Sequence, residues 1–186
     1  FWRSHDLTAI PSILLKRVQE LKNCKVVRDE YEHIYNSYKK FLDNGLISNY
    51  YMGFLSICLP SYPSMFLDMA RKNIHISIIV TPNVFFKIKI EHDDEFEEFL
   101  KFENTHFYVY DNAKMTFVVT DHVLSLSLFF KNGCFDFQND LMGFDSCAVK
   151  WGESLFEFYR DNSIEIISLH NPADKMHKKL KKDKKL

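Results

Sequence analysis

The chain has 186 residues, of which 46% are hydrophobic and 16% are aromatic, and its formal net charge is -1. This length fits one domain, or one domain with an appendage, and supplies enough apolar residues for a sizeable core. A net charge near zero excludes a domain that binds nucleic acid through bulk positive charge. No apolar run reaches the ~18 residues that a membrane-spanning helix needs, so we expect no membrane partner.

The first third of the chain alternates helical and strand patterns. Apolar residues at helical spacing predict a helix from Pro11 to Leu21, and Cys24 to Val27 is a short strand candidate. Asp29 is suited to cap a helix that extends to Leu42 and ends at Asn44-Gly45. The almost unbroken apolar run from Tyr50 to Leu59 is typical of a strand that is buried on both faces.

The middle of the chain continues this alternation. Pro60 to Pro63 ends the apolar strand and starts a helix, and Ile74 to Val80 is the next strand. Thr81-Pro82 supplies a helix cap followed by proline at the first helical position. A second short helix is predicted after Asp93-Asp94, and Thr105 to Tyr110 is predicted to be a strand.

Residues 112–160 form the unit on which the other elements are expected to pack. Two apolar strands, Lys114 to Asp121 and Val123 to Phe130, are followed by Asn132-Gly133 and by a helix that starts near Asp145. One face of this helix carries apolar residues at i, i+3, i+4, i+7, i+8 and i+11, which predicts a buried face. Its members are Ala148, Trp151, Gly152, Leu155, Phe156 and Tyr159.

These elements predict an α/β fold with a mixed, mostly parallel sheet and helices on both faces. Strand–helix–strand alternation favours parallel pairing with right-handed crossovers, whereas the closely spaced strands after residue 105 favour antiparallel pairs. We expect residues 1–22 to be a lead-in with a connector helix, and residues 23–170 to be the α/β domain. Residues 171–186 are rich in lysine and are expected to be a disordered tail.

The sequence carries no recognisable catalytic, metal or cofactor motif. The eight histidines show no metal spacing, and Gly-rich phosphate loops and a G-x-S-x-G elbow are absent. The four cysteines have no C-x-x-C spacing, so we expect free buried thiols in a reducing cytoplasm. His5-Asp6 is an adjacent pair that is typical of a surface position or a cap. We therefore expect no enzyme activity, no cofactor and no metal.

A ligand pocket is predicted at the carboxyl ends of the parallel strands, because loops at those ends converge on one crevice. Hydroxyls, an amide and carboxylates beside aromatic rings suit a small polar ligand. The candidate effector-binding residues are Ser61, Tyr62, Thr81, Asn83, Tyr110, Thr116 and Asp121. The alternative interpretation is structural, because Ser and Thr before a helix are common caps and Asp121 precedes a turn.

Several runs resemble the regulatory domain of archaeal winged-helix transcriptional regulators, in the family named for a filament-form regulator of methanogenesis. The resemblance covers about residues 1–166. The runs that carry it are Phe1 to Pro11, Leu59 to Pro63, Ile78 to Thr81 with Val84-Phe85, Phe117 to Asp121, Leu126 to Phe130, and Trp151 to Tyr159.

This resemblance implies a cytoplasmic domain that senses an unknown small-molecule effector and forms a homodimer. It also implies that DNA is bound by a winged helix-turn-helix domain upstream of Phe1, which fits a chain that begins with Phe and not with Met. The identity of the effector, and whether it releases or recruits DNA, are not implied.

The fold is also similar to one half of a phospholipase-D-like unit. The enzymes of that group carry H-x-K-x-x-x-x-D, and alignment on Asp121 puts Lys114 at the His position and Thr116 at the Lys position. The missing histidine nucleophile argues against phosphodiesterase activity. A degenerate phosphodiesterase and a protein-interaction module without a small ligand remain the alternatives to a sensing domain.

Overall fold

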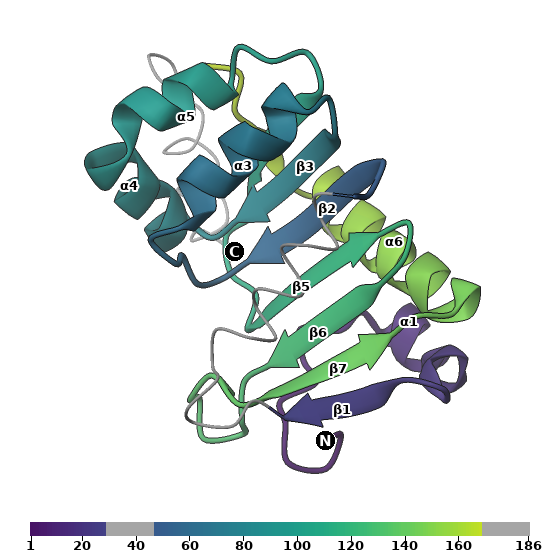
Figure 1. Ribbon diagram of the computed structural model, residues 1–186. Coiled ribbons are helices and arrows are strands. Elements are labelled where there is room, and N and C mark those ends of the chain that lie inside the picture. The colour runs from purple at the N-terminus through teal and green to yellow at the C-terminus, as the bar shows by residue number, and fades with distance from the viewer. Residues whose placement is uncertain (29–46, 169–186) are drawn as a thin grey trace.

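The computed structural model describes residues 1–28 and 47–168, which form one eight-stranded sheet with helices on both faces (Figure 1). The strand order is β1-β7-β6-β5-β2-β3-β4-β8. The strands are β1 (Lys25–Arg28), β2 (Tyr50–Leu55), β3 (His75–Val80), β4 (Thr105–Val109), β5 (Met115–Thr120), β6 (Leu124–Leu128), β7 (Asn139–Gly143) and β8 (Ile164–Glu165). The helices are α1 (Ser12–Leu15), the 3-10 helix η1 (Val18–Leu21), α3 (Tyr62–Arg71), α4 (Pro82–Glu91), α5 (Asp93–Phe99) and α6 (Ser146–Asp161).

The mixed α/β fold with helices on both faces is confirmed, but parallel pairs are the minority. Among the described residues only β2–β3 and β3–β4 pair in parallel, and the other five strand pairings are antiparallel. Parallel neighbours need a crossover, and α3 and the α4–α5 pair supply the two crossovers. The connection between β5 and β6 is too short for a helix, and that between β6 and β7 contains none, so each strand turns back on its neighbour.

Each face of the sheet has its own hydrophobic core. Helices α3, α4 and α5 pack over β2, β3 and β4 on one face, where Phe66, Phe96 and Phe107 belong to the same cluster. Helix α6 lies on the other face together with α1 and η1, and Trp151 and Phe117 belong to that second cluster. Figure 1 shows α3 in front of the sheet and α6 behind it.

Helix α6 matches the prediction from the sequence. All six residues of the predicted face are buried. The Asp145 side chain caps the helix by accepting a hydrogen bond from the backbone N–H of Ala148 at 2.9 Å. The amphipathic pattern and the cap therefore agree on where this helix begins and which side it buries.

Other predictions differ from the structure in detail. The expected helix from Pro11 to Leu21 is divided into α1 and η1, and the expected strand from Tyr50 to Leu59 ends at Leu55. Strands β7 and β8 had no counterpart in the sequence prediction. The predicted helix from Asp29 to Leu42 and the lysine-rich tail lie outside the described residues.

All four cysteines carry free thiols, but only Cys58 is buried, whereas Cys134 and Cys147 are exposed. The expectation of buried thiols is therefore wrong for those two positions. Burial beside the Asp145 carboxylate raises the pKa of Cys24 to about 11. Within residues 1–28 and 47–168, every helix is too short or too polar to cross a bilayer.

Candidate functional site

Six of the seven candidate residues lie at the edge where β2, β3 and β4 end. Ser61 and Thr81 are the N-cap residues of α3 and α4, and neither makes a side-chain cap hydrogen bond. Tyr62 is the first residue of α3, and Asn83 is an exposed residue in the first turn of α4. The structural interpretation of Ser61 and Thr81 as side-chain caps is therefore not what the structure shows.

The six residues share this edge but face different sides of the sheet. The Tyr62 ring packs on Phe66, at a centroid distance of 5.7 Å, on the α3 side. The Tyr110 ring packs edge-on against Tyr159 of α6 at 4.9 Å, on the opposite side. Thr116 lies in β5 beside the end of β2, where its hydroxyl is 3.0 Å from that of Ser56. The edge therefore carries two small groups of polar side chains and not one polar crevice.

Asp121 does not belong to this edge. Strand β5 runs antiparallel to β2, and Thr120 pairs with Tyr51 near the start of β2. Asp121 therefore lies at the opposite edge, where it accepts hydrogen bonds from the Asn49 backbone N–H at 3.2 Å and the Asn49 side chain at 2.6 Å. Burial by itself raises the pKa of Asp121, but the hydrogen bonds from Asn49 outweigh it and lower that pKa. Its position favours the turn role over the ligand role.

The positions aligned with the phospholipase-D motif do not converge. Lys114 precedes β5 and Asp121 follows it, so the two side chains lie at opposite ends of the strand. The Lys114 ammonium is 3.8 Å from the Asp6 carboxylate, and its side chain is half exposed. The argument against phosphodiesterase activity therefore remains the missing histidine.

An apolar cavity of about 20 Å³ lies between α3, α4, α5 and the sheet. Tyr62, Val84 and Phe96 are among the side chains that line it, and Glu95 is the only charged residue in the lining. A cavity of this size has room for about one water molecule. Of the candidate residues, only Tyr62 lines it, so the described residues show an apolar cavity next to the candidate edge and not the expected polar pocket.

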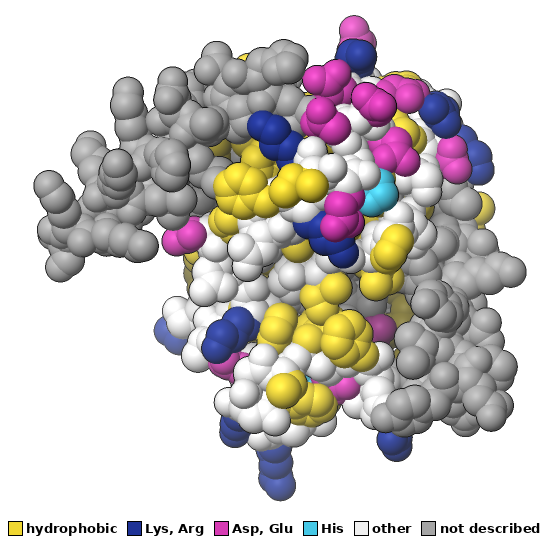
Figure 2. Space-filling model, turned by 90° about the vertical axis from the view of Figure 1, so that its left-hand side faces the viewer, with side chains coloured by type: hydrophobic (Ala, Val, Ile, Leu, Met, Phe, Trp, Pro, Cys, Tyr) yellow, Lys and Arg dark blue, Asp and Glu magenta, His cyan; other side chains and the backbone are white. Residues whose placement is uncertain are grey.

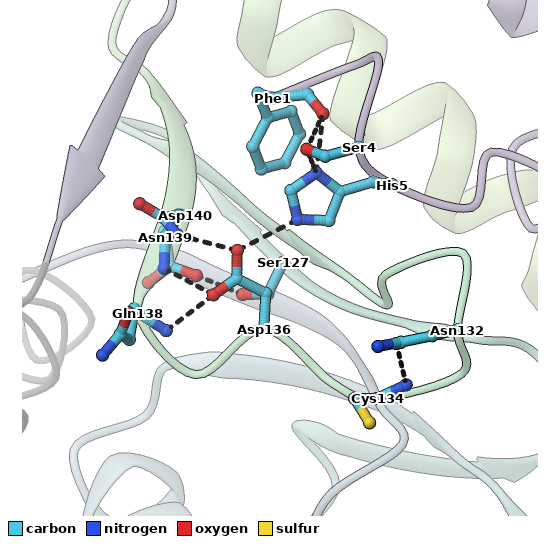
Figure 3. A network of polar contacts seen from close by, with 10 residues as sticks. All are labelled: Phe1, Ser4, His5, Ser127, Asn132, Cys134, Asp136, Gln138, Asn139 and Asp140. Carbon is cyan, nitrogen blue, oxygen red and sulfur yellow. Dashed lines mark hydrogen bonds and ion pairs between the residues drawn. The ribbon is translucent and has the colours of Figure 1, made fainter.

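A buried polar network ties the N-terminal segment to the β6–β7 connection (Figure 3). His5 and Asp136 are each 2% exposed, and the His5 Nε2 atom is 3.0 Å from an Asp136 carboxylate oxygen. The His5 ring stacks on Phe130 at a centroid distance of 4.8 Å, and the backbone N–H of Asp6 donates to the carbonyl of Phe129. Segments separated by 131 residues are therefore held together by one buried His–Asp hydrogen bond and its surrounding contacts.

The Asp136 carboxylate is fully satisfied in this network. It accepts hydrogen bonds from the backbone N–H groups of Gln138 and Asn139 and from the side chains of Asn139 and His5. Burial by itself raises the pKa of Asp136, but these hydrogen bonds, with that of the Asn139 side chain the largest, together lower it. Asp136 therefore stays charged inside the protein.

Ser4, His5 and Asp136 look like a nucleophile–base–acid set, but the contacts do not activate Ser4. The His5 Nδ1 atom is 2.6 Å from the carbonyl oxygen of Phe1 and 3.2 Å from the Ser4 hydroxyl. Because a carbonyl and a carboxylate only accept, both ring nitrogens of His5 act as donors, so Nδ1 cannot receive a proton from Ser4, whose hydroxyl donates to the same carbonyl. The set is structural.

Sequence reasoning missed this network, although it noted His5-Asp6. The partner of His5 is not its neighbour, because Asp6 accepts from the Thr8 hydroxyl and backbone N–H instead. These hydrogen bonds from Thr8 lower the pKa of Asp6. Among the described residues, no group of three His, Cys, Asp or Glu side chains could hold a metal ion.

The fold that these elements build is a phospholipase-D-like α/β domain. It matches Nuc, a phospholipase D family member from Salmonella typhimurium, with a TM-score of 0.54 and 10% identity over 78% of this chain and 99% of that chain. It also matches TrmBL2, described as an archaeal chromatin protein, with a TM-score of 0.61 and 14% identity over 83% of this chain and 60% of that chain. At these identities the likeness shows the fold alone.

The sequence comparison defines the family. The model of the middle domain of methanogenesis regulatory protein FilR1 matches residues 34–162, which is more than half of the chain, so the chain belongs to this family of regulatory domains. Methanogenesis regulatory protein FilR1 of Methanothrix harundinacea (strain 6Ac) is 24% identical over 174 residues, which cover 89% of this chain. The match covers only 38% of that relative's length.

Proposed function

We propose that this chain is the effector-sensing and dimerising domain of a transcriptional regulator, and that it has no catalytic role. The single observation that carries the sensing role is the apolar cavity beneath α3, α4 and α5, which is lined by residues in the first turns of α3 and α4. Membership of a regulatory family supports the same assignment. The arrangement of Ser4, His5 and Lys114 supports the absence of catalysis.

The cavity suggests the chemistry of the effector. Its lining is apolar except for Glu95, so the buried part of the ligand is apolar, and polar groups of the ligand would remain near Ser61, Thr81 and Asn83 at the edge. About 20 Å³ is too small for a metabolite, so the helices must move apart when it binds. Helices α4 and α5 are short, which makes such a shift feasible without unfolding the sheet.

The remaining parts of the proposal concern the whole regulator. Residues 1–22 would connect the domain to an upstream winged helix-turn-helix, residues 23–170 would form the sensing domain, and DNA would be read upstream of residue 1. The protein would act in the cytoplasm as a homodimer, because winged-helix regulators usually pair to read two half-sites. The chain alone should therefore bind operator DNA weakly, and tight sequence-specific binding in a gel-shift assay would contradict this division of roles.

The sensing role is tested with a panel of small apolar acids, amines and alcohols, using thermal unfolding as the measurement. A ligand at a hundredfold excess over its Kd stabilises the fold by about 2.7 kcal/mol. Val84→Leu adds volume to the cavity lining, because Val84 lines the cavity and is 5% exposed. Lys87→Leu is the matched control, because Lys87 lies on the same helix, is exposed and does not line the cavity.

A compound that stabilises the wild type and Lys87→Leu more than Val84→Leu would support the assignment. A compound that stabilises all three equally would bind elsewhere and would contradict the cavity as the effector site. Stabilisation lost in Asp121→Asn but retained in Val84→Leu would move the site to the opposite edge.

A further inference from the structure

Two groups of hydrophobic side chains, each fully or partly exposed, lie on one side of the molecule. In the β6–β7 connection, Phe129, Phe135 and Phe137 form a ladder of edge-to-face contacts with centroid distances of 5.0 and 4.8 Å. The ladder ends in solvent, because Phe137 is 60% exposed. On α4, Phe86 and Ile90 are one helical turn apart and are 51% and 81% exposed.

Figure 1 places α4 and α5 at the upper left and the β6–β7 connection at the lower left, and Figure 2 looks directly onto that side. Hydrophobic side chains gather there in an upper and a lower group, each surrounded by polar side chains. Apolar groups clustered on a surface in this way mark an interaction site, whereas isolated exposed hydrophobic residues do not.

Charge is divided between the two ends of the same side. Helix α5 is rich in acidic residues, and three of them, Asp93, Asp94 and Glu95, lie in its first turn. The lower end carries the exposed basic residues Arg3 and Lys131, which lie close together because the Lys131 backbone N–H donates to the carbonyl of Ser4. Figure 2 shows most of the acidic side chains towards the top, with basic ones among them, and mainly basic side chains at the bottom.

We propose that this side, which we call the bipolar face, docks against a second copy of the chain in a closed twofold dimer. The face is defined by Phe86, Ile90, Asp93 and Asp94 in its upper half and by Arg3, Lys131 and Phe137 in its lower half. The upper half of one copy covers the lower half of the other, so that α4 meets the phenylalanine ladder and α5 meets Arg3 and Lys131. This assignment rests on the dimer of the proposed function and names the surface that makes it.

The argument for a second copy is complementarity of the face to itself. A twofold axis in the plane of the face exchanges its upper and lower halves, and it therefore brings acidic residues to basic ones twice. The same rotation brings each hydrophobic group to the other group, which buries both. An acidic or a basic partner would satisfy only one end and would be repelled by the other.

The hydrophobic half of the assignment is tested by Phe137→Ser, with Phe144→Ser as a matched control. Phe144 is 62% exposed, but it follows β7 at the opposite edge of the sheet. Sedimentation equilibrium gives the dimer dissociation constant of each variant. We expect Phe137→Ser to raise this constant at least tenfold and Phe144→Ser to leave it unchanged, with circular dichroism spectra matching that of the wild type.

The predicted pairing of acidic with basic residues across the dimer interface is tested by reversing the charge of single side chains. Lys131→Glu and Asp94→Lys each place like charges across the interface, so each should raise the dissociation constant about tenfold, and the double reversal should restore it. Asp161→Lys is the control, since Asp161 is exposed at the end of α6 on the far side of the sheet. Added salt should weaken the wild-type dimer, because the charged pairs lie at its periphery.

The outcomes separate the surface from the dimer itself. A dimer that survives Phe137→Ser and Lys131→Glu unchanged overturns the bipolar face and leaves the proposed dimer to another surface. A chain that stays monomeric at about 100 µM, where even a weak regulator dimer would assemble, overturns both and leaves the face to a different partner. Failure of the double reversal to restore association overturns the pairing of α5 with Lys131.

Discussion

The two faces of the sheet are covered in different ways. On one face a single long helix, α6, packs with Trp151 and Leu155 fully buried, and the Trp151 indole N–H donates to the carbonyl of Leu14 at 3.1 Å. The Tyr159 hydroxyl donates to the carbonyl of Ala9 on the same side. On the other face three shorter helices meet around a cavity, and Glu95 reaches its lining.

The difference indicates that one face of the sheet is held rigidly and that the other can rearrange. The α6 face is joined to the N-terminal segment by buried hydrogen bonds, so movement there would disturb the whole sheet. The α3–α5 face has a void and short helices, so a local rearrangement there would leave the sheet intact. The proposed sensing role needs both properties, because a shift on one face is useful only if the other face holds its shape.

The largest effect should come from emptying the tightly packed face. Leu155→Ala on α6 should cost about 4–5 kcal/mol of unfolding free energy, because the surrounding side chains cannot collapse into the space. Ile88→Ala, beside the existing cavity, should cost about 2–3 kcal/mol, since short helices can relax around it. Leu155 is 0% and Ile88 is 7% exposed, so both are core positions. Urea unfolding measures both values, and equal losses would remove the proposed difference between the faces.

Asp136→Asn should cost about 2–3 kcal/mol at pH 7, because the substitution removes the charge from a buried network that is built to hold it. The folded-state pKa of Asp136 is lowered, so its contribution is present above the ordinary carboxyl pKa of about 3.9. That contribution is lost as the pH falls through the folded-state pKa. The gap between wild type and variant should therefore shrink as urea unfolding is repeated from pH 7 down to pH 2.

Asp161→Asn is the control for this series, because Asp161 is exposed and pairs with its neighbour Arg160 on the surface. A gap at pH 7 that is no larger for Asp136→Asn than for Asp161→Asn would show that the network does not hold the N-terminal segment in place.

The sequence predicted helix α6 much better than strand β7. Helix α6 was found with its cap and all of its buried face, because Asp145 and an uninterrupted helical period are local signals. Strand β7 was missed, because Asn139-Asp-Leu-Met-Gly143 is short and partly polar, and its place depends on β6 and β1 on either side. Pairing with the neighbouring strands determines where such a strand forms, and the β-propensity of its own residues does not.

The candidate site was predicted in part for a related reason. The carboxyl ends of the parallel strands did bring Ser61, Thr81 and Thr116 to one edge, as the order of elements implied. Asp121 was assigned to the wrong edge because β5 runs antiparallel to β2. The residues of a strand do not by themselves indicate its direction in the sheet. The His5–Asp136 contact joins residues 131 positions apart, and no spacing rule reaches that far.

Gly143→Ala tests how closely α6 approaches the sheet. A Cβ atom at residue 143 would lie 2.5 Å from the Ala148 Cβ atom, which has no rotamer through which to move away. Overpacking of this kind should cost about 2 kcal/mol. Adding Ala148→Gly should recover part of that loss, and a double-mutant cycle from urea unfolding measures the coupling. Strictly additive losses would contradict the close approach.

The smallest change in unfolding free energy is expected from adding a single methylene to the core on each face. This change is also the most direct test of the difference between the two faces. Val84→Ile extends into the cavity of about 20 Å³, so the gain from burying one more methylene, up to about 0.8 kcal/mol, should outweigh crowding. Val149→Ile on α6 is the matched control, because Val149 is 7% exposed and packs against the second core, where extra volume should be neutral or destabilising. Urea unfolding should therefore show opposite signs for the same chemical change, and the reverse order would place the adaptable side of the domain under α6.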